Sequence, residues 1–242
     1  MTISPRRRTW ISFSFLIGGF LAFYLVWSRL NSAEPIEGAP APMRQVFELN
    51  GRVWKSLFNE RKRSECAAPT KGKIPRVNGK IGLDADFDAK DWKLEIVADE
   101  QDPASPHFSV TLQDILALPR TDTATNFRCI EGWSEDMAFA GVKFSEFMKA
   151  YNLRGKPYVG LETVDGEYYV SIDLESMLHS QTLLAYEMNG EPLKPANGAP
   201  LRLVIPVKYG IKNIKRIGKI FFSDRRPPDY WAEQGYDWYA GL

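Results

Sequence analysis

The chain is poor in cysteine and histidine, which excludes several classes of site. Its 242 residues contain two cysteines, Cys66 and Cys129, and two histidines, His107 and His179. Two cysteines can form only a single bridge, so a disulfide framework is not expected. The histidines lack the ligand spacing of a zinc site. The sequence contains no C-x-x-C-H haem attachment motif and no internal repeat.

The composition is that of a packed globular protein. Hydrophobic residues make up 44% of the chain and aromatic residues 13%, and the formal net charge is +1. This aromatic content indicates a large core and argues against disorder. The length fits one domain of roughly 170–200 residues with an appendage.

A long uncharged run near the N-terminus predicts a membrane anchor. No charged residue occurs from Trp10 to Trp27, and a helix of that length spans about 27 Å, close to the thickness of a hydrocarbon core. Arg6, Arg7 and Arg8 precede the run, so the positive-inside rule places them in the cytoplasm and the rest of the chain across the membrane. We predict a retained single-pass anchor at residues 1–31. A cleaved signal peptide, with a shorter apolar region of roughly 7–15 residues, and a buried core helix are the alternatives.

Two further segments precede the main domain. Ser32 to Met43 contains three prolines and a glycine, which is typical of a semi-rigid spacer. Gln45 to Arg63 carries apolar residues at roughly helical spacing, which predicts an amphipathic helix docked on the domain. The basic end of that helix, Arg61 to Arg63, is interpreted as a solvated helix end, with contact to anionic lipid as the alternative. We assign residues 32–70 to this linker and helix, and residues 71–242 to the main domain.

Strands and short helices alternate through the main domain. Patterning predicts strands at Trp92–Val97, Tyr158–Val164, Tyr168–Asp173, Leu183–Met188, Leu201–Val207 and Lys219–Phe222. A helix ending at Leu118 should follow a capping box of Thr111 and Asp114, and Asn189-Gly190 predicts a type I′ hairpin turn. A helical face of Phe144, Phe147, Met148 and Tyr151 is predicted to be core. The expected fold class is α+β, with mixed β-sheets and short helices behind one N-terminal transmembrane helix.

Cys129, taken as a single residue, is interpreted as an ordinary buried thiol, because free cysteines are often buried. A thiolate can also bind a soft metal, and the neighbouring Arg128 would favour its negative charge. A metal-ligand role for Cys129 rests on the family resemblance described below.

Basic residues are concentrated between Arg202 and Arg226. This segment has eight basic residues and one acid, Asp224, for a net charge of +7. We expect such a stretch to face an anion, a membrane or a partner, with a solvated surface as the alternative. Lysines and backbone N–H groups around Gly210 are suited to holding a phosphate. Nucleic acid is not expected as a partner, because the basic residues alternate with strand-like apolar residues.

Three motifs resemble the molybdopterin-binding domain of the sulfite oxidase superfamily. They are Phe127–Ser134, Leu183–Gly190 and Pro200–Pro206. Within that superfamily, Arg128–Ser134, Asn197–Arg202 and Lys208–Lys215 are more similar to the bacterial periplasmic methionine-sulfoxide reductase catalytic subunits. The resemblance covers Arg76 to Leu242 and implies the α+β core of that family.

The resemblance implies a molybdenum–molybdopterin cofactor and a set of site residues. Cys129 would be the metal ligand and a catalytic residue, and Tyr168 would be a second catalytic residue near the metal, with Tyr169 as the alternative. Asn213, Ile214 and Lys215 would surround the pterin phosphate. The other implied cofactor contacts are Thr163, Asn197, Arg202, Arg76, Asn78 and Gly79.

The same resemblance implies a two-electron oxygen-atom transfer on a small, sulfur-containing substrate in the periplasm. Electrons would be exchanged with a separate partner, a haem protein in or at the inner membrane. Arg7-Arg8-Thr9-Trp10-Ile11 also resembles a twin-arginine export signal, which suits a protein that folds around a cofactor before export. The chain lacks the Asn-Asn-x-Tyr-Glu run of the reductases and the clustered arginines of the sulfite oxidases, and Asn197 stands where the latter have histidine. Sulfite oxidation and a non-catalytic, membrane-anchored binding module are therefore the alternatives.

Overall fold

The computed structural model describes residues 5–58, 63–64, 66, 69, 74–83, 88 and 90–242, with the backbone alone for Pro5, Arg6 and Arg8. Within the predicted twin-arginine signal, Arg7 to Ile11, only the side chain of Arg8 lies outside this description. Arg61 and Lys62 of the basic helix end and Lys71 to Lys73 of the main domain lie outside the described residues.

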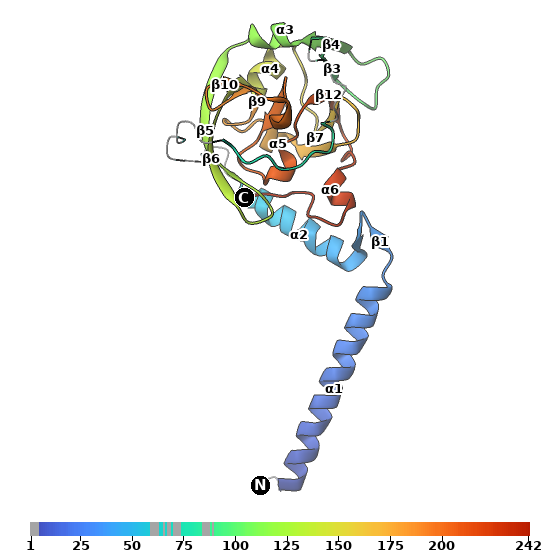
Figure 1. Cartoon of the computed structure of the whole chain (residues 1–242). Coiled ribbons are helices and arrows are strands. Elements are labelled where there is room, and N and C mark those ends of the chain that lie inside the picture. Colours follow the sequence, from blue (N-terminus) through green and yellow to red (C-terminus); the bar gives the residue numbers. More distant parts are fainter. Residues whose placement is uncertain are drawn as a thin grey trace.

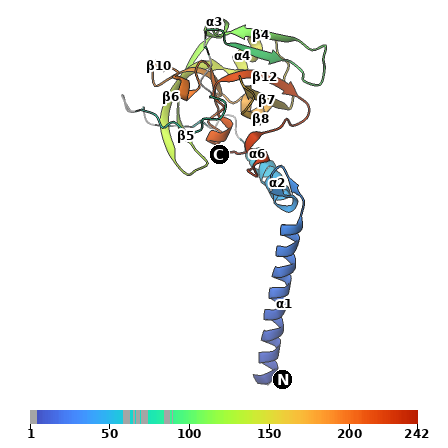
Figure 2. The same ribbon diagram turned by 45° about the vertical axis from the view of Figure 1, so that its right-hand side comes forward.

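The N-terminal helix stands apart from the rest of the protein. Helix α1 (Pro5–Ser32) projects away from the domain as a single rod, in Figure 1 and in the rotated view of Figure 2. Its residues Thr9–Ser32 are long and apolar enough to cross a membrane, and none of them is buried within the protein. The predicted N-terminal apolar helix is therefore confirmed.

The predicted spacer is in part a folded element. Strands β1 (Pro35–Ile36) and β2 (Ala39–Pro40) form a small antiparallel hairpin, and helix α2 (Ala41–Leu57) begins directly after it. The prediction that Ser32 to Met43 is only a spacer is therefore wrong. Pro42 does not prevent the helix from starting, because it lies in the first helical turn, where its missing N–H costs nothing. The helix also ends before Arg63, at Leu57.

One five-stranded sheet contains the only parallel strand pair among the described residues. Its order is β4 (His107–Thr111), β3 (Lys93–Val97), β12 (Ile217–Ser223), β7 (Tyr158–Thr163) and β8 (Tyr169–Asp173). Strand β12 runs parallel to β3, and the other pairs are antiparallel. The sheet is therefore mixed, as predicted.

The second five-stranded sheet is antiparallel. It has the order β10 (Glu191–Pro192), β9 (Leu183–Met188), β6 (Ser134–Lys143) and β5 (Arg120–Arg128), and β11 (Arg202–Val204) also pairs with β9. Asn189 and Gly190 both have positive φ, at 53° and 83°, which confirms the type I′ turn. The predicted strand at Leu201–Val207 is shorter than expected, because the Ile205 N–H donates to Asn213 Oδ1 (2.8 Å) and leaves the ladder.

Short helices cover the sheets. They are α3 (Leu112–Leu116), α4 (Phe144–Ala150), α5 (Leu174–Met177) and α6 (Tyr230–Glu233), with 3-10 turns η1 (Pro195–Asn197) and η2 (Gly210–Lys212). The predicted capping box before α3 is confirmed, although the helix ends two residues before Leu118. Phe144 and Phe147 are fully buried in a core shared by both sheets, and Met148 and Tyr151 belong to the same core.

Much of the basic segment turns inward. Lys208 forms a buried ion pair with Asp173 (3.0 Å) and Lys212 forms one with Asp229. The expectation that the whole segment faces an anion, a membrane or a partner is therefore wrong for these two lysines. Their carboxylate partners lie on other elements, at the end of β8 and before α6.

Asp173→Asn is expected to lower the free energy of unfolding by about 3–5 kcal/mol, because it leaves Lys208 buried without a counter-charge. Asparagine still caps α5, so the change isolates the lost charge. The matched control is Glu175→Gln, whose pair with Lys55 is exposed and should cost under about 1 kcal/mol. Denaturant unfolding of both variants checks this; equal losses would contradict the buried pair's role.

Candidate functional site

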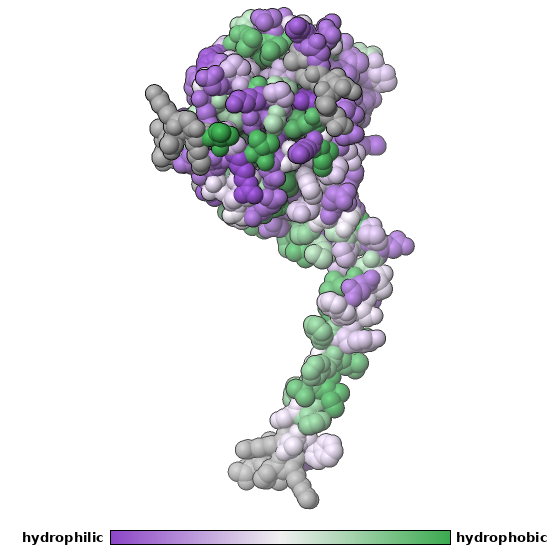
Figure 3. Space-filling view, viewed as in Figure 1, coloured by the Kyte–Doolittle hydropathy of each residue, from purple (hydrophilic) through white to green (hydrophobic). Residues whose placement is uncertain are grey.

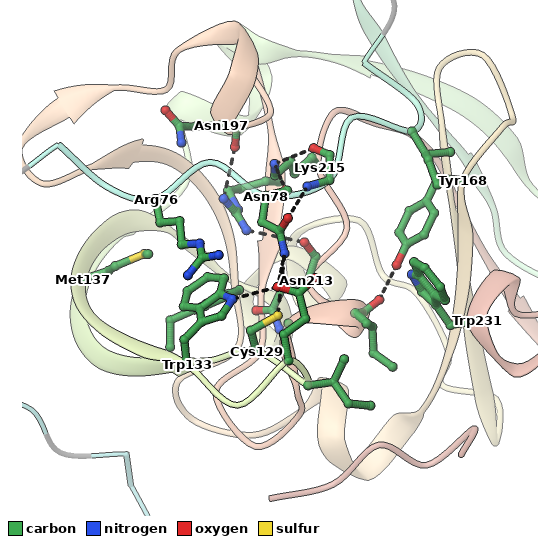
Figure 4. Close-up of a pocket in the computed structure, with 18 of the residues that line it drawn as sticks. Arg76, Asn78, Cys129, Trp133, Met137, Tyr168, Asn197, Asn213, Lys215 and Trp231 are labelled. Atoms are coloured by element: carbon green, nitrogen blue, oxygen red, sulfur yellow. Dashed lines mark hydrogen bonds between the residues drawn. The ribbon is translucent and has the colours of Figure 1, made fainter. Parts of the chain in front are cut away.

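A cavity of about 180 Å³ lies where loops from the two sheets meet. Nine of the eleven predicted catalytic and cofactor-binding residues line it: Arg76, Asn78, Gly79, Cys129, Tyr168, Asn197, Arg202, Asn213 and Lys215. In Figure 4, Asn78 lies above Cys129 near the centre of the view, with Arg76 on the left and Tyr168 on the right. The fold thus gathers residues that are as much as 139 positions apart (76 to 215) in one place.

Cys129 lies on the tight turn that follows β5. Its N–H donates to the Trp133 carbonyl (2.9 Å), and the Gly132 N–H donates to the Cys129 carbonyl (3.1 Å). Gly132 has φ +88°, a conformation that glycine adopts without strain. The thiol is 8% exposed and lines the cavity, with Sγ 3.8 Å from Asn78 Nδ2.

A small network joins the Cys129 turn to the segment that carries Asn78. Asn78 Nδ2 and Trp133 Nε1 both donate to Glu131 Oε2, at 3.1 and 3.0 Å. The bond from Trp133, followed by that from Asn78, lowers the pKa of Glu131 and keeps it ionised. Arg76 lies over the Trp133 ring at 4.8 Å. Glu131 and Trp133 were not predicted as site residues, although both lie in the motif around Cys129.

Arg202 is a buried cation whose surroundings suit an anionic ligand. It is 4% exposed, and its Nη1 and Nη2 donate to the carbonyls of Asn197 (3.1 Å) and Asn213 (3.4 Å). Its buried Nε has no hydrogen-bond partner among the described residues. Burial lowers the pKa of Arg202 to about 10, and no described carboxylate offsets the effect. An unpaired buried charge is costly, so this guanidinium fits an anionic ligand.

Lys215 adds a second cation beside Arg202. Among the described residues, its Nζ donates only to carbonyl oxygens, those of Asn78 (2.6 Å), Gly79 (3.1 Å) and Ala196 (3.1 Å). Burial, and then the charge of Arg202, lowers the pKa of Lys215 to about 8. The two cations together give the cavity a positive wall.

Asn213 organises the loop that carries this wall. Its side chain accepts from the Ile205 N–H (2.8 Å) and donates from Nδ2 to the Tyr209 carbonyl (3.1 Å). Within the same loop, Gly210 approaches the Phe127 ring so closely that an added Cβ would lie 3.1 Å from it. The Asn213 side chain therefore stabilises the loop, and the Asn213 main-chain carbonyl accepts a hydrogen bond from Arg202.

Of the two adjacent tyrosines, Tyr168 lines the cavity and Tyr169 does not. The Tyr168 hydroxyl donates to the Ile211 carbonyl (2.6 Å), and Trp231 lies beside it (Figure 4). Burial, and then the charge of Asp229, raises the pKa of Tyr168 far above its ordinary range, so the phenol stays neutral. Tyr169 instead hydrogen-bonds Glu233 and does not line the cavity.

Thr163 and Ile214 lie outside the cavity lining. Thr163 Oγ1 donates to Asp165 Oδ1 (2.6 Å), and its side chain packs against Gly82. Ile214 is 1% exposed and belongs to the core. Trp231 and Tyr236 line the cavity but were not predicted, because no sequence pattern distinguishes them from core aromatics.

The donor set fits a metal that arrives within a larger anionic cofactor. Among the described residues, no group of three or more His, Cys, Asp or Glu side chains could hold a bare metal ion. The cavity instead offers one thiol, Cys129, together with a guanidinium whose Nε is unpaired among the described residues and a partly buried lysine. A cofactor that brings its own metal ligands and an acidic tail matches this arrangement.

Fold and cavity together define a protein that binds an acidic, metal-bearing cofactor. Residues 81–231 match the model of the oxidoreductase molybdopterin-binding domain, and the chain belongs to this family of molybdopterin oxidoreductases. The family membership implies a molybdenum cofactor and confirms the predicted enzyme class.

Named relatives and a solved structure agree with this assignment. A protein of Azospira oryzae, provisionally named protein-methionine-sulfoxide reductase subunit YedZ1, is 32% identical over 98% of this chain and 88% of its own length. The protein-methionine-sulfoxide reductase catalytic subunit MsrP of Campylobacter jejuni is 31% identical over 67% of this chain and 60% of its own. The sulfane dehydrogenase SoxCD of Paracoccus pantotrophus shares the fold, with a TM-score of 0.51 at 23% identity over 59% of this chain and 40% of that one. The predicted sulfite-oxidase-like fold is confirmed.

Proposed function

We propose that this chain is a membrane-anchored molybdopterin oxidoreductase that transfers an oxygen atom and two electrons on a small, sulfur-containing substrate in the periplasm. One observation carries the proposal: the Cys129 thiol shares its cavity with two cations, the buried Arg202 and the partly buried Lys215, that have no carboxylate partner among the described residues. A thiol for the metal and cations for an acidic tail are the two features that this cofactor needs.

Each wall of the cavity has its own role. Cys129 would hold molybdenum as the thiolate. Arg202 and Lys215, with the loop at Asn213, hold the acidic end of the cofactor, and Asn78 fixes the turn that presents Cys129. When bound, the cofactor supplies oxygen-atom exchange and storage of two electrons, while the protein supplies orientation and electrostatics.

The remaining walls suit a sulfoxide substrate. Trp133, Trp231 and Ile130 contribute apolar lining to the cavity, and the neutral Tyr168 lies beside Trp231. Reduction of a sulfoxide consumes two electrons and two protons and yields a thioether and water, and a thioether is apolar. The relatives named as methionine-sulfoxide reductases support this direction.

Two alternatives remain distinct from this proposal. Sulfite oxidation calls for a cluster of arginines that bind the doubly charged substrate, and here Arg202 is already committed to the cofactor wall. A non-catalytic binding module on the same fold has no need of a thiol at Cys129, where the turn aims it into the cavity.

The anchor and the electron supply complete the proposal. We place α1 in the inner membrane as a retained single-pass helix, with the catalytic domain in the periplasm. The sequence has no haem attachment motif, so electrons come from a separate partner, which we propose to be a haem protein in or at the membrane. The substrate is a small molecule, and nucleic acid is not a partner.

The activity assay compares two substrates on protein purified from its own cells. Methionine sulfoxide with a reduced viologen dye should give dye oxidation, while sulfite with ferricyanide should give little turnover. Preferential oxidation of sulfite would favour the sulfite oxidase alternative. Turnover of neither substrate by cofactor-loaded protein would contradict the proposed chemistry.

Cofactor retention is expected to fall as pH rises above about 8. In the cofactor-free protein the pKa of Lys215 is about 8, and a bound phosphate raises it, because opposite charge favours the protonated form. Binding above pH 8 therefore takes up a proton, and affinity falls by up to about tenfold per pH unit. Pterin retained after gel filtration at pH 7 to 9.5 measures this. Lys215→Arg keeps its charge and should flatten the profile; an unchanged slope would contradict the role of Lys215.

A further inference from the structure

Helix α2 leaves a continuous apolar stripe uncovered. Six side chains form this stripe, each between 43% and 67% exposed: Met43, Val46, Leu49, Val53, Trp54 and Leu57. Their spacing of three or four residues, with Trp54 beside Val53, places them on one side of the helix. In Figure 3 the underside of the domain, where α2 lies, shows an apolar area in line with the apolar helix α1.

The stripe cannot turn inward, because the other side of α2 is fixed to the domain. Arg44 is 4% exposed and donates to the carbonyls of Tyr236 (2.9 Å) and Ala232 (2.7 Å) near the C-terminus. Gly51 packs against Tyr239, where an added Cβ would lie 3.3 Å away. These contacts set the rotation of the helix, so the stripe points outward.

The same contacts tie α2 to the end of the candidate membrane span. That span ends at Ser32, and the β1–β2 hairpin occupies most of the interval before α2 begins at Ala41. Arg44 also donates to the carbonyls of Ile36 (3.3 Å) and Glu37 in the hairpin. The apolar stripe is therefore held within a few residues of the point where the chain would leave the bilayer.

We propose that α2 lies flat in the interface of the membrane that α1 spans, with its apolar stripe among the lipid acyl chains near the headgroups. An amphipathic helix of this kind sinks about 5–10 Å into that boundary. Trp54 belongs to a residue type enriched at this depth. The exposed Arg52 lies beyond the edge of the stripe, where it meets anionic headgroups. The proposal rests on α1 being a retained anchor.

The test uses the full chain in nanodiscs of phosphatidylcholine and phosphatidylglycerol, with or without brominated acyl chains that quench tryptophan. Trp54→Phe gives a background in which single tryptophans are added back. Val46→Trp places one on the stripe, and Arg52→Trp, the matched control, places one on the same helix outside it. Subtracting the spectrum of the Trp54→Phe background removes the fluorescence of the tryptophans that the variants share, including Trp10 and Trp27 of α1.

The tryptophan at position 46 should lose more than about half of its fluorescence in brominated discs, because it lies at the acyl-chain boundary. The tryptophan at position 52 should lose much less. Equal, weak quenching at both positions, in discs that retain the intact chain, would overturn the proposal that α2 lies in the membrane interface. A protein partner that covers the stripe would give this same result. If the chain is instead absent from the discs and mass spectrometry shows that it has been shortened, the anchor proposal has failed.

Discussion

Cys129→Ala is expected to abolish turnover while the fold persists. We expect a loss of at least about 10³-fold, equivalent to roughly 4 kcal/mol of transition-state stabilisation, because the metal loses its protein ligand. The folded state should change little, since the only hydrogen bond to Sγ among the described residues comes from Asn78 Nδ2 at 3.8 Å. The turn itself is held by backbone bonds that alanine keeps.

The matched control is Cys66→Ala, which removes the only other thiol in the chain. Cys66 does not line the cavity, and burial, together with the charge of Asp136, raises its pKa. This variant should keep its activity. The measurements are turnover, far-UV circular dichroism and molybdenum content of both variants. An active, metal-loaded Cys129→Ala protein would refute the assignment of Cys129 as the ligand.

Arg202→Met is expected to release the cofactor without unfolding the protein. The buried guanidinium has no carboxylate partner in the part of the chain that the structure describes. Its replacement by an apolar side chain of similar length should therefore leave the cofactor-free protein about as stable as before, or more stable. Cofactor binding should weaken by about 10- to 150-fold, the loss of one charge-assisted hydrogen bond of about 1.5–3 kcal/mol.

Lys219→Met provides the control, because it removes a cation of the same basic segment that does not line the cavity. Pterin fluorescence and melting temperature are measured for both variants. The expected pattern is pterin loss with an unchanged or raised apo melting temperature for Arg202→Met alone. A lower melting temperature and full pterin content would mean that Arg202 serves packing rather than the cofactor.

Local motifs predicted the cavity well where neighbouring residues act together. In the Cys129 turn and in the Asn197–Arg202 segment, the site residues are close together in the sequence. Their order in the sequence is therefore enough to predict that they line the same cavity. Ile214 differs because neighbouring side chains in this bend point in different directions. Asn213 and Lys215 line the cavity, whereas Ile214, between them, enters the core.

Long-range pairing was beyond sequence patterns. Lys208 and Lys212 appeared to be surface charges because their partners, Asp173 and Asp229, lie 35 and 17 residues away. The mixed sheets and the type I′ turn were predictable, since both depend on local alternation and turn chemistry. The start of α2 was not, because a proline in the first turn of a helix resembles a proline in a spacer.

The central claim is that this chain holds a molybdenum cofactor through Cys129. The most direct test is elemental analysis for molybdenum, with pterin fluorescence, on wild-type and Cys129→Ala protein purified from membranes of its own cells. The account predicts close to one molybdenum per chain in the wild type and a loss of metal in the variant. Wild-type protein without molybdenum, made where cofactor synthesis is intact, would contradict the account and favour a binding module on the same fold.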